Sequence, residues 1–325
     1  MKAMIIKEIG STEVFQLAEK AKPEAKSGHM VVEVKATSVN PLDTMLRSIE
    51  LPWSANLPEI LHGDVAGVVI EVAADVTNFN VGDEVYGMAG GINGVDGALA
   101  EFMLVDARLM AKKPKTLTMK QAAALPLVSI TAYEALVQKM NVKAGDNVLI
   151  HGATGGVGHI AVQLAKVLGA NVTSTYSPAN KALAKTLGAD NLVDYTIEEV
   201  ADYVAAYTGG VGFDKVFDTI AGDNIQKSFE AAKYYGHVST ILPIENPLQT
   251  ALKSLSFHGV LMLIPLCHGI NHESHGRILT EIAALVDAGK ITPIIDESDY
   301  SIWEVAKAHD LLSSGQAVGK ITLTV

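Results

Sequence analysis

The feature that most constrains the fold of this chain is a strand that turns through glycines into a helix. It reads Val148-Leu149-Ile150-His151-Gly152-Ala153-Thr154-Gly155-Gly156-Val157-Gly158, followed by the helical run 161–165. Around it, apolar runs that predict strands at 147–151, 171–175, 191–194, 214–218 and 237–241 alternate with helical periodicity at 157–168, 180–187, 197–207 and 224–234. Strands joined by helices pair in parallel, with right-handed crossovers. The pattern therefore predicts an α/β protein with a doubly wound parallel sheet.

The flanking sequence has a different texture. Short alternating runs at 30–36, 66–72, 83–86 and 98–105, with glycines between them, predict a small antiparallel barrel or sandwich. Helical periodicity follows at 119–124 and 130–140, and the tail carries helices at 278–288 and about 305–313 before a last strand at 319–325. We expect a first domain at 1–122, a second at 123–265, and a return to the first at 266–325.

Composition excludes several classes of protein. With 325 residues and 49% hydrophobic content, the chain is long enough for two cores. A formal net charge of −11 argues against nucleic acid or an anionic membrane as a partner. The single cysteine, Cys267, excludes an intrachain disulfide. No apolar run is long enough to span a bilayer, and the N-terminus lacks a secretion signal, so we expect a cytoplasmic protein.

The glycine turn indicates a phosphate site. A helix that begins at such a turn presents unpaired backbone N–H groups and the positive end of its dipole to a pyrophosphate. Gly155 would permit close approach of the ligand, and Gly158 would permit the helix to pack on the strand. The alternative is a tight turn without a ligand. The predicted cofactor contacts in and near this turn are Gly152, Thr154, Gly155, Gly156, Val157, Gly158 and, on a later strand, Thr219.

The end of the second strand of this sheet favours NADPH over NADH. NAD-binding chains place an acidic residue there to bind the ribose 2′-hydroxyl. The segment 174–181 contains no acid, whereas Ser177 and Lys181 offer a hydroxyl and a cation to a 2′-phosphate. The alternative for Lys181 is an ordinary solvated helix residue.

The motifs together resemble the zinc-free quinone oxidoreductase (zeta-crystallin-like) branch of the medium-chain dehydrogenase/reductase superfamily. They are Asn40-Pro41-Leu42-Asp43, Gly63-Asp64-Val65-Ala66-Gly67-Val68-Val69, Gly82-Asp83-Glu84-Val85-Tyr86-Gly87, Gly97-Ala98-Leu99-Ala100-Glu101-Phe102, Leu125-Pro126-Leu127 with Thr131-Ala132-Tyr133-Glu134-Ala135-Leu136, and Val318-Gly319-Lys320-Ile321. The resemblance implies a GroES-like substrate domain and a Rossmann domain, with NADPH in the cleft between them.

The resemblance also implies roles for single residues. Asn40 and Thr131 would lie by the nicotinamide and its ribose, and Lys181 and Tyr195 would hold the 2′-phosphate. Asp43 would be a catalytic proton relay or a carboxylate that braces its loop. An apolar acceptor pocket is expected, and its candidate residues, each of which ordinary packing would also explain, are Met45, Leu46, Leu51, Trp53, Met88 and Tyr133.

Zinc-dependent relatives hold their catalytic metal with a cysteine, a histidine and an acid. This chain has Asn40, Gly63 and Asp64 at the matching places, so two of three ligands are missing and no metal is expected. Without a Lewis acid, direct hydride transfer needs an acceptor that spreads the developing charge, such as a quinone or an α,β-unsaturated carbonyl. Alternatives are an enoyl thioester or haloacrylate reductase, and a NADPH-binding sensor or structural protein without turnover.

Three further patterns in the sequence lead to expectations. The apolar run from Val260 to Ile264 is expected to be an edge strand through which two copies form a homodimer. Cys267, His268, His272 and His275 resemble a metal cluster, but the intervening Gly269, Asn271 and Ser274 favour a loop without metal. His62 is expected to be a packed, hydrogen-bonded side chain rather than a catalytic one.

Overall fold

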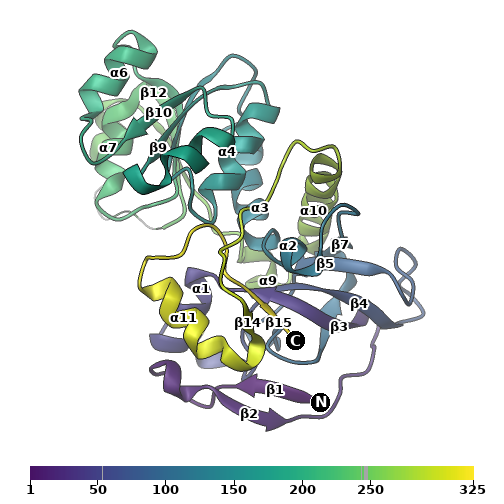
Figure 1. The fold of residues 1–325 in the computed structure, drawn as a ribbon. Coiled ribbons are helices and arrows are strands. Elements are labelled where there is room, and N and C mark those ends of the chain that lie inside the picture. Colours follow the sequence, from purple (N-terminus) through teal and green to yellow (C-terminus); the bar gives the residue numbers. More distant parts are fainter. Residues whose placement is uncertain (53, 243, 245–247) are drawn as a thin grey trace. The chain divides into compact units, whose positions relative to one another are not determined.

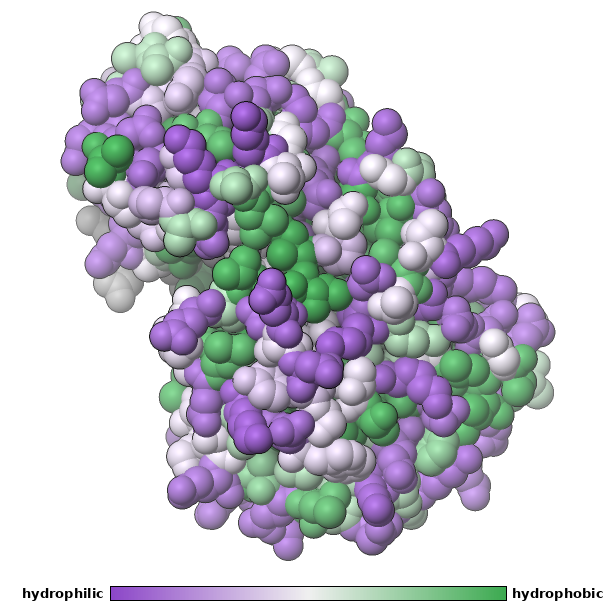
Figure 2. Space-filling view, in the orientation of Figure 1, coloured by the Kyte–Doolittle hydropathy of each residue, from purple (hydrophilic) through white to green (hydrophobic). Residues whose placement is uncertain are grey.

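The computed structural model describes residues 1–52, 54–242, 244 and 248–325, and the chain divides into two compact units (Figure 1). Unit 1 comprises Met1–Leu127, Leu263–Gly289 and Pro293–Val325; unit 2 comprises Val128–Met262 and Lys290–Thr292. The expected divisions after residues 122 and 265 stay a prediction about the domains. On the face that Figure 2 shows, hydrophilic residues predominate over the part of unit 2 that contains α6 and α7.

Unit 1 is built on a largely antiparallel seven-stranded sheet. Its path is β14-β15-β3-β4-β5-β7, with β6 paired to β3. The strands are β3 (His29–Ser38), β4 (Asp64–Val72), β5 (Glu84–Met88), β6 (Phe102–Asp106), β7 (Met110–Lys112), β14 (Tyr300–Ser301) and β15 (Thr322–Thr324), beside the hairpin β1 (Lys2–Ile5) and β2 (Gln16–Glu19). Apolar side chains of β3, β4 and β6 form one core, including Val32, Val69 and Val105. The antiparallel prediction is confirmed.

Unit 1 also contains helices, most of them short. They are η1 (Thr12–Val14), α1 (Pro41–Ser48), η2 (Ser54–Asn56), η3 (Ala107–Leu109), α2 (Met119–Ala123), α9 (Ile264–His268), α10 (His272–Asp287), η6 (Ile302–Glu304) and α11 (Val305–Ser313). The loop expected around 267–275 is wrong over most of its length, because only residues 269–271 separate α9 from α10. Gly269, at φ 65°, ends α9, and Asn271, at φ 53°, precedes α10.

Unit 2 contains the predicted parallel sheet, in the order β10-β9-β8-β11-β12-β13. Its elements are α3 (Pro126–Tyr133, which begins in unit 1), the π-helix η4 (Glu134–Lys139), β8 (Asn147–His151), α4 (Gly158–Val167), β9 (Asn171–Tyr176), η5 (Pro178–Asn180), α5 (Lys181–Thr186), β10 (Asn191–Asp194), α6 (Val200–Thr208), β11 (Phe213–Asp218), α7 (Asn224–Ala231), β12 (Ala232–Thr240), α8 (Leu248–Leu252) and β13 (Ser256–Gly259). Chain order reverses between β8 and β11, where doubly wound sheets bind ligands. No helix in the described part of the chain has the length and hydropathy to cross a bilayer.

Several predicted bounds are wrong. The edge strand is β13, Ser256–Gly259, rather than the run from Val260 to Ile264. That run leaves the sheet after one hydrogen bond from Val260 N to Thr240 O and turns into α9, near whose start Pro265 lies. The helix expected over 224–234 ends at Ala231, and only the end of the strand expected over 98–105 belongs to β6.

The core of unit 1 contains a buried pair of histidines. His62 and His309 are both fully shielded from solvent, with 2.9 Å between their Nε2 atoms. Arg47 Nε donates to His309 Nδ1 at 3.3 Å. His309 therefore carries its proton on Nε2 and donates it to His62, whose proton lies on Nδ1, 3.5 Å from Thr37 Oγ1. This arrangement needs both rings neutral, and it confirms that His62 is packed and hydrogen-bonded.

Because the rings are held neutral, we expect the protein to lose stability in acid. Burial lowers the pKa of His62 well below its usual value and that of His309 to about 3. The unfolded chain then binds more protons below pH 6.5, so stability falls as pH drops from about 6.5 towards 4, by up to about 1.4 kcal/mol per pH unit for His309. Urea unfolding midpoints between pH 7.5 and 4.5 measure this. His309→Gln should flatten the profile and the exposed His268→Gln should not; equal profiles for all three proteins would refute the explanation.

Candidate functional site

The glycine turn of unit 2 has the geometry of a phosphate cradle. Gly152, at φ 81°, leaves β8, and its N–H donates to Thr175 Oγ1 at 2.9 Å. A Cβ at Gly158 would lie 1.8 Å from Gly152 O, so a side chain there would separate α4 from the end of β8. A Cβ at Gly155 would meet only Gly152 O, at 3.5 Å. The space beside Gly155 is thus open, and the first turn of α4 offers its N–H groups to an anion.

The end of the neighbouring strand β11 lies beside this turn. Thr219 follows β11, and its hydroxyl donates to His151 O at 2.6 Å. Asp218, fully buried, accepts from Ile220 N and Ala221 N, and thereby holds the loop that carries Thr219. The predicted residues Gly152, Gly155, Gly158 and Thr219 therefore come together where the sheet order reverses.

The predicted 2′-phosphate contacts gather at the ends of β9 and β10. Lys181 begins α5, is exposed, and its Nζ lies 5.9 Å from the centre of the Tyr176 ring. Tyr195 N donates to Tyr176 O at 3.4 Å, and the Tyr195 residue is 53% exposed. Ser177, which directly follows Tyr176, is half-buried. The nearby acid, Asp194, directs its Oδ1 to Thr196. A cation, a hydroxyl and a phenol are therefore available to a phosphate, which fits the extra phosphate of NADPH.

In unit 1, Asn40 lies in a buried polar cluster. It is 1% exposed, and its Nδ2 donates to Asp64 Oδ2 at 2.8 Å, while its Oδ1 accepts from Lys320 Nζ. Asp64 and Lys320, at 0% and 3% exposure, are 3.7 Å apart. Burial lowers the pKa of Lys320, which Asp64 and Asp43 partly counteract. In the sequence, Lys320 stands out only as part of the motif 318–321, because nothing in the local pattern reveals that its ammonium is buried.

Asp43 lies next to this cluster, in the first turn of α1. Its Oδ2 accepts the N–H of Asn40 at 2.7 Å and closes a capping box at the helix start. Burial is the main reason that the pKa of Asp43 rises to about 7. This hydrogen bond holds the backbone of Asn40 in place. It is the contact that a bracing role for Asp43 requires; the other expected role was a proton relay.

The positions that match zinc ligands have other uses here. A Cβ on Gly63 would lie 2.3 Å from Met88 Cε and 2.7 Å from Gly90 O, so Met88, 1% exposed, fills the place of a side chain. The amide of Asn40 is engaged by Lys320 and Asp64. Nowhere in the described ranges do three His, Cys, Asp or Glu side chains gather as metal ligands.

The remaining pocket candidates are only partly described. Met45 on α1 and Leu51 after it are half-buried, and Trp53 lies outside the described residues. Thr131 and Tyr133 belong to α3 in unit 2, where Thr131 is 5% exposed. Their role as an acceptor pocket stays a prediction.

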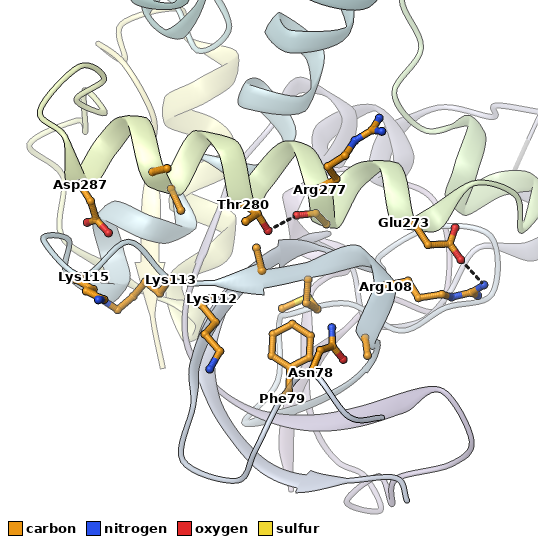
Figure 3. Close-up of a pocket in the computed structure, with 16 residues that line it drawn as sticks. Asn78, Phe79, Arg108, Lys112, Lys113, Lys115, Glu273, Arg277, Thr280 and Asp287 are labelled. Atoms are coloured by element: carbon orange, nitrogen blue, oxygen red, sulfur yellow. Dashed lines mark hydrogen bonds and ion pairs between the residues drawn. The ribbon is translucent and has the colours of Figure 1, made fainter. Parts of the chain in front are cut away.

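A separate cavity of about 610 Å³ lies in unit 1 between α10 and the segment 107–115 (Figure 3). Several cations line it, but carboxylates compensate them: Arg108 pairs with Asp106 and Glu273, and Lys112 with Asp83. None of the predicted site residues lines this cavity.

Comparisons with known proteins agree with this geometry. A family model described as "Alcohol dehydrogenase GroES-like domain" matches residues 26–115, and one described as "Zinc-binding dehydrogenase" matches residues 187–323. The chain is 33% identical to a 2-methylene-furan-3-one reductase of Solanum lycopersicum (99% of this chain, 79% of the relative). It is 31% identical to a quinone oxidoreductase of Homo sapiens (99% and 97%) and 32% identical to a chloroplastic NADPH-dependent alkenal/one oxidoreductase of Arabidopsis thaliana (99% and 79%).

Solved structures extend the likeness over the full length. An alcohol dehydrogenase superfamily protein of Novosphingobium aromaticivorans has a TM-score of 0.94 at 38% identity, covering 100% of this chain and 99% of the other. A mycobacterial protein solved in complex with NADPH has a TM-score of 0.85 at 28% identity, covering 100% of both. The chain therefore belongs to the zinc-free quinone oxidoreductase branch of the medium-chain dehydrogenase/reductase superfamily.

Proposed function

We propose that this protein is an NADPH-dependent oxidoreductase that transfers hydride directly to a quinone or an α,β-unsaturated carbonyl. The proposal rests on the residues at the positions that match the metal ligands of zinc-dependent relatives. Gly63 has no side chain and lies against Met88, and the amide of Asn40 is hydrogen-bonded to Lys320 and Asp64. The names of the relatives, which include quinone and alkenal/one oxidoreductases, support the same acceptor class.

The absence of a metal-ligand set among the residues that the structure describes restricts the acceptor. A simple ketone concentrates the charge that develops on one oxygen, and a metal ordinarily stabilises that charge. A quinone or enone spreads it over a conjugated system, so hydrogen-bond donors or water suffice. When bound, NADPH supplies the hydride. The chain's own task is to hold both reactants in contact and in the correct orientation.

We assign the residues as follows. Backbone N–H groups of the turn from Gly152 to Gly158 bind the pyrophosphate, with Thr219 beside them; those of Gly152, Ala153 and Gly155 donate within the protein and take no part. Ser177, Lys181 and Tyr195 hold the 2′-phosphate. Asn40 positions the reactants, Thr131 contacts the cofactor, and Asp43 braces Asn40, a role that its 2.7 Å hydrogen bond supports. The single cysteine supports a reducing compartment such as the cytoplasm.

The first test is NADPH oxidation across a panel of quinones, alkenals, enoyl thioesters and haloacrylates. We expect turnover with quinones or alkenals, because these acceptors delocalise the transferred charge. Turnover confined to thioesters or haloacrylates would move the enzyme to another acceptor class. Binding of NADPH without oxidation of it above the blank would show a sensor or structural protein instead.

The cofactor assignment is tested at Lys181. Lys181→Ala removes a charge-assisted contact to the 2′-phosphate, so the dissociation constant for NADPH should rise roughly 10- to 100-fold, with little change for NADH. Fluorescence titration with both nucleotides measures this. Lys185→Ala, an exposed lysine of the same helix α5, is the matched control and should alter neither constant. Equal weakening of NADPH and NADH would remove Lys181 from the site.

We further propose that two copies form a homodimer through β13. This strand is at the edge of the sheet of unit 2, and exposed apolar side chains lie near it in sequence, including Leu248 (58%), Leu252 (63%) and Leu261 (42%). An uncovered apolar edge favours association. Sedimentation equilibrium at micromolar protein should give the mass of a dimer, and Leu261→Asp, which places a charge among these exposed apolar side chains, should weaken it. A monomer would refute this interface.

A further inference from the structure

The amide of Asn40 lies between a buried cation and a buried anion. Lys320 Nζ donates to Asn40 Oδ1 and, at 2.9 Å, to Val39 O. On the other side, Asn40 Nδ2 donates to Asp64 Oδ2 at 2.8 Å. All three side chains are almost fully buried. The two ends of the amide therefore face opposite charges.

Asp64 is occupied by neutral donors rather than by the ammonium. Its carboxylate accepts Ser38 Oγ at 2.6 Å and Leu127 N at 2.8 Å in addition to Asn40 Nδ2. The direct separation from Lys320 Nζ is 3.7 Å, beyond hydrogen-bond distance. The cation and the anion are thus linked by hydrogen bonds through the amide of Asn40.

This arrangement permits only one orientation of the amide. The two ends of an asparagine amide are nearly the same in shape, so sterics alone permit a flip. An ammonium can only donate and a carboxylate only accepts. A flipped amide would place its NH2 against the ammonium and its oxygen against the carboxylate, and inside the protein such mismatches are costly because water does not screen them.

We propose that Lys320 is a positioning residue, which together with Asp64 fixes the polarity of the Asn40 amide and thereby decides which of its atoms face the reactants. One N–H of Nδ2 remains for that purpose after the observed hydrogen bonds. The inference rests on the proposed function, because it gives Asn40 the task of orienting the reactants.

The first arm of the test separates positioning from stability. Lys320→Met removes the ammonium and should lower kcat by about 10- to 100-fold, but it also leaves Asp64 buried without a cation. The double variant Lys320→Met/Asp64→Asn removes both charges. It should regain unfolding stability while kcat stays low, because a neutral amide at position 64 no longer fixes the orientation of Asn40. Recovery of kcat together with stability would overturn the proposal.

A matched control exists in the same unit. Lys113 is also buried, with a side chain 5% exposed; it donates to Pro114 O at 2.9 Å and pairs with Glu84 at 3.3 Å. Lys113→Met should lower stability, as any loss of a buried lysine does, and leave kcat unchanged. A fall in kcat equal to that of Lys320→Met would show that the effect is not specific to Asn40 and would overturn the proposal.

The second arm does not depend on turnover. In protein labelled with 15N-asparagine, the side-chain amide signal of Asn40 is assigned by its loss in Asn40→Asp. Its protons should exchange slowly in the wild type and roughly tenfold faster or more in Lys320→Met. Unchanged exchange would overturn the proposal. If the wild type oxidises NADPH with none of the acceptors in the panel, the proposed function fails. The exchange measurement still decides whether Lys320 holds the amide.

Discussion

The packing of unit 1 around its polar cluster depends on the hydrogen bonds that the buried carboxylate of Asp64 accepts. Located at the start of β4, this carboxylate accepts hydrogen bonds from Ser38 at the end of β3, from Asn40 and from Leu127 at the start of α3, and Lys320 lies 3.7 Å away, just before β15. Four segments distant in sequence therefore meet at one charge. Since a buried charge without partners is strongly unfavourable, each segment is required by the others.

Unit 2 depends on a steric constraint instead. Because Gly158 has no side chain, the first turn of α4 approaches Gly152 O directly, which places the positive N-terminal end of the helix at this turn. The hydrogen bonds of Thr175 and Thr219 to the same turn hold its backbone in this form. A cradle of backbone N–H groups needs no net positive charge, which is how a chain with a net charge of −11 can offer an anion site.

The proposed hydride transfer follows from where each unit places its charged side chains. In unit 2, Lys181 is exposed and the segment 174–181 contains no acidic residue, which suits a phosphate. In unit 1, positions that would hold a metal in zinc-dependent relatives carry a glycine under Met88 and an amide between Lys320 and Asp64. In the function that we propose, such a site orients the reactants and does not activate an oxygen atom, so the acceptor itself accommodates the negative charge.

The sequence by itself determined the class of fold, the order of strands and helices in 147–241, the glycine turn and the family, because these depend on local periodicity and on glycines whose roles are local. It misplaced the edge strand at 260–264, where burial in a turn and Pro265 outweigh apolar strand propensity. Only the tertiary structure decided that Lys320 meets Asn40, that His62 pairs with His309 and that Met88 lies against Gly63. These contacts join residues far apart in the chain, and no local pattern records which buried polar groups will satisfy one another.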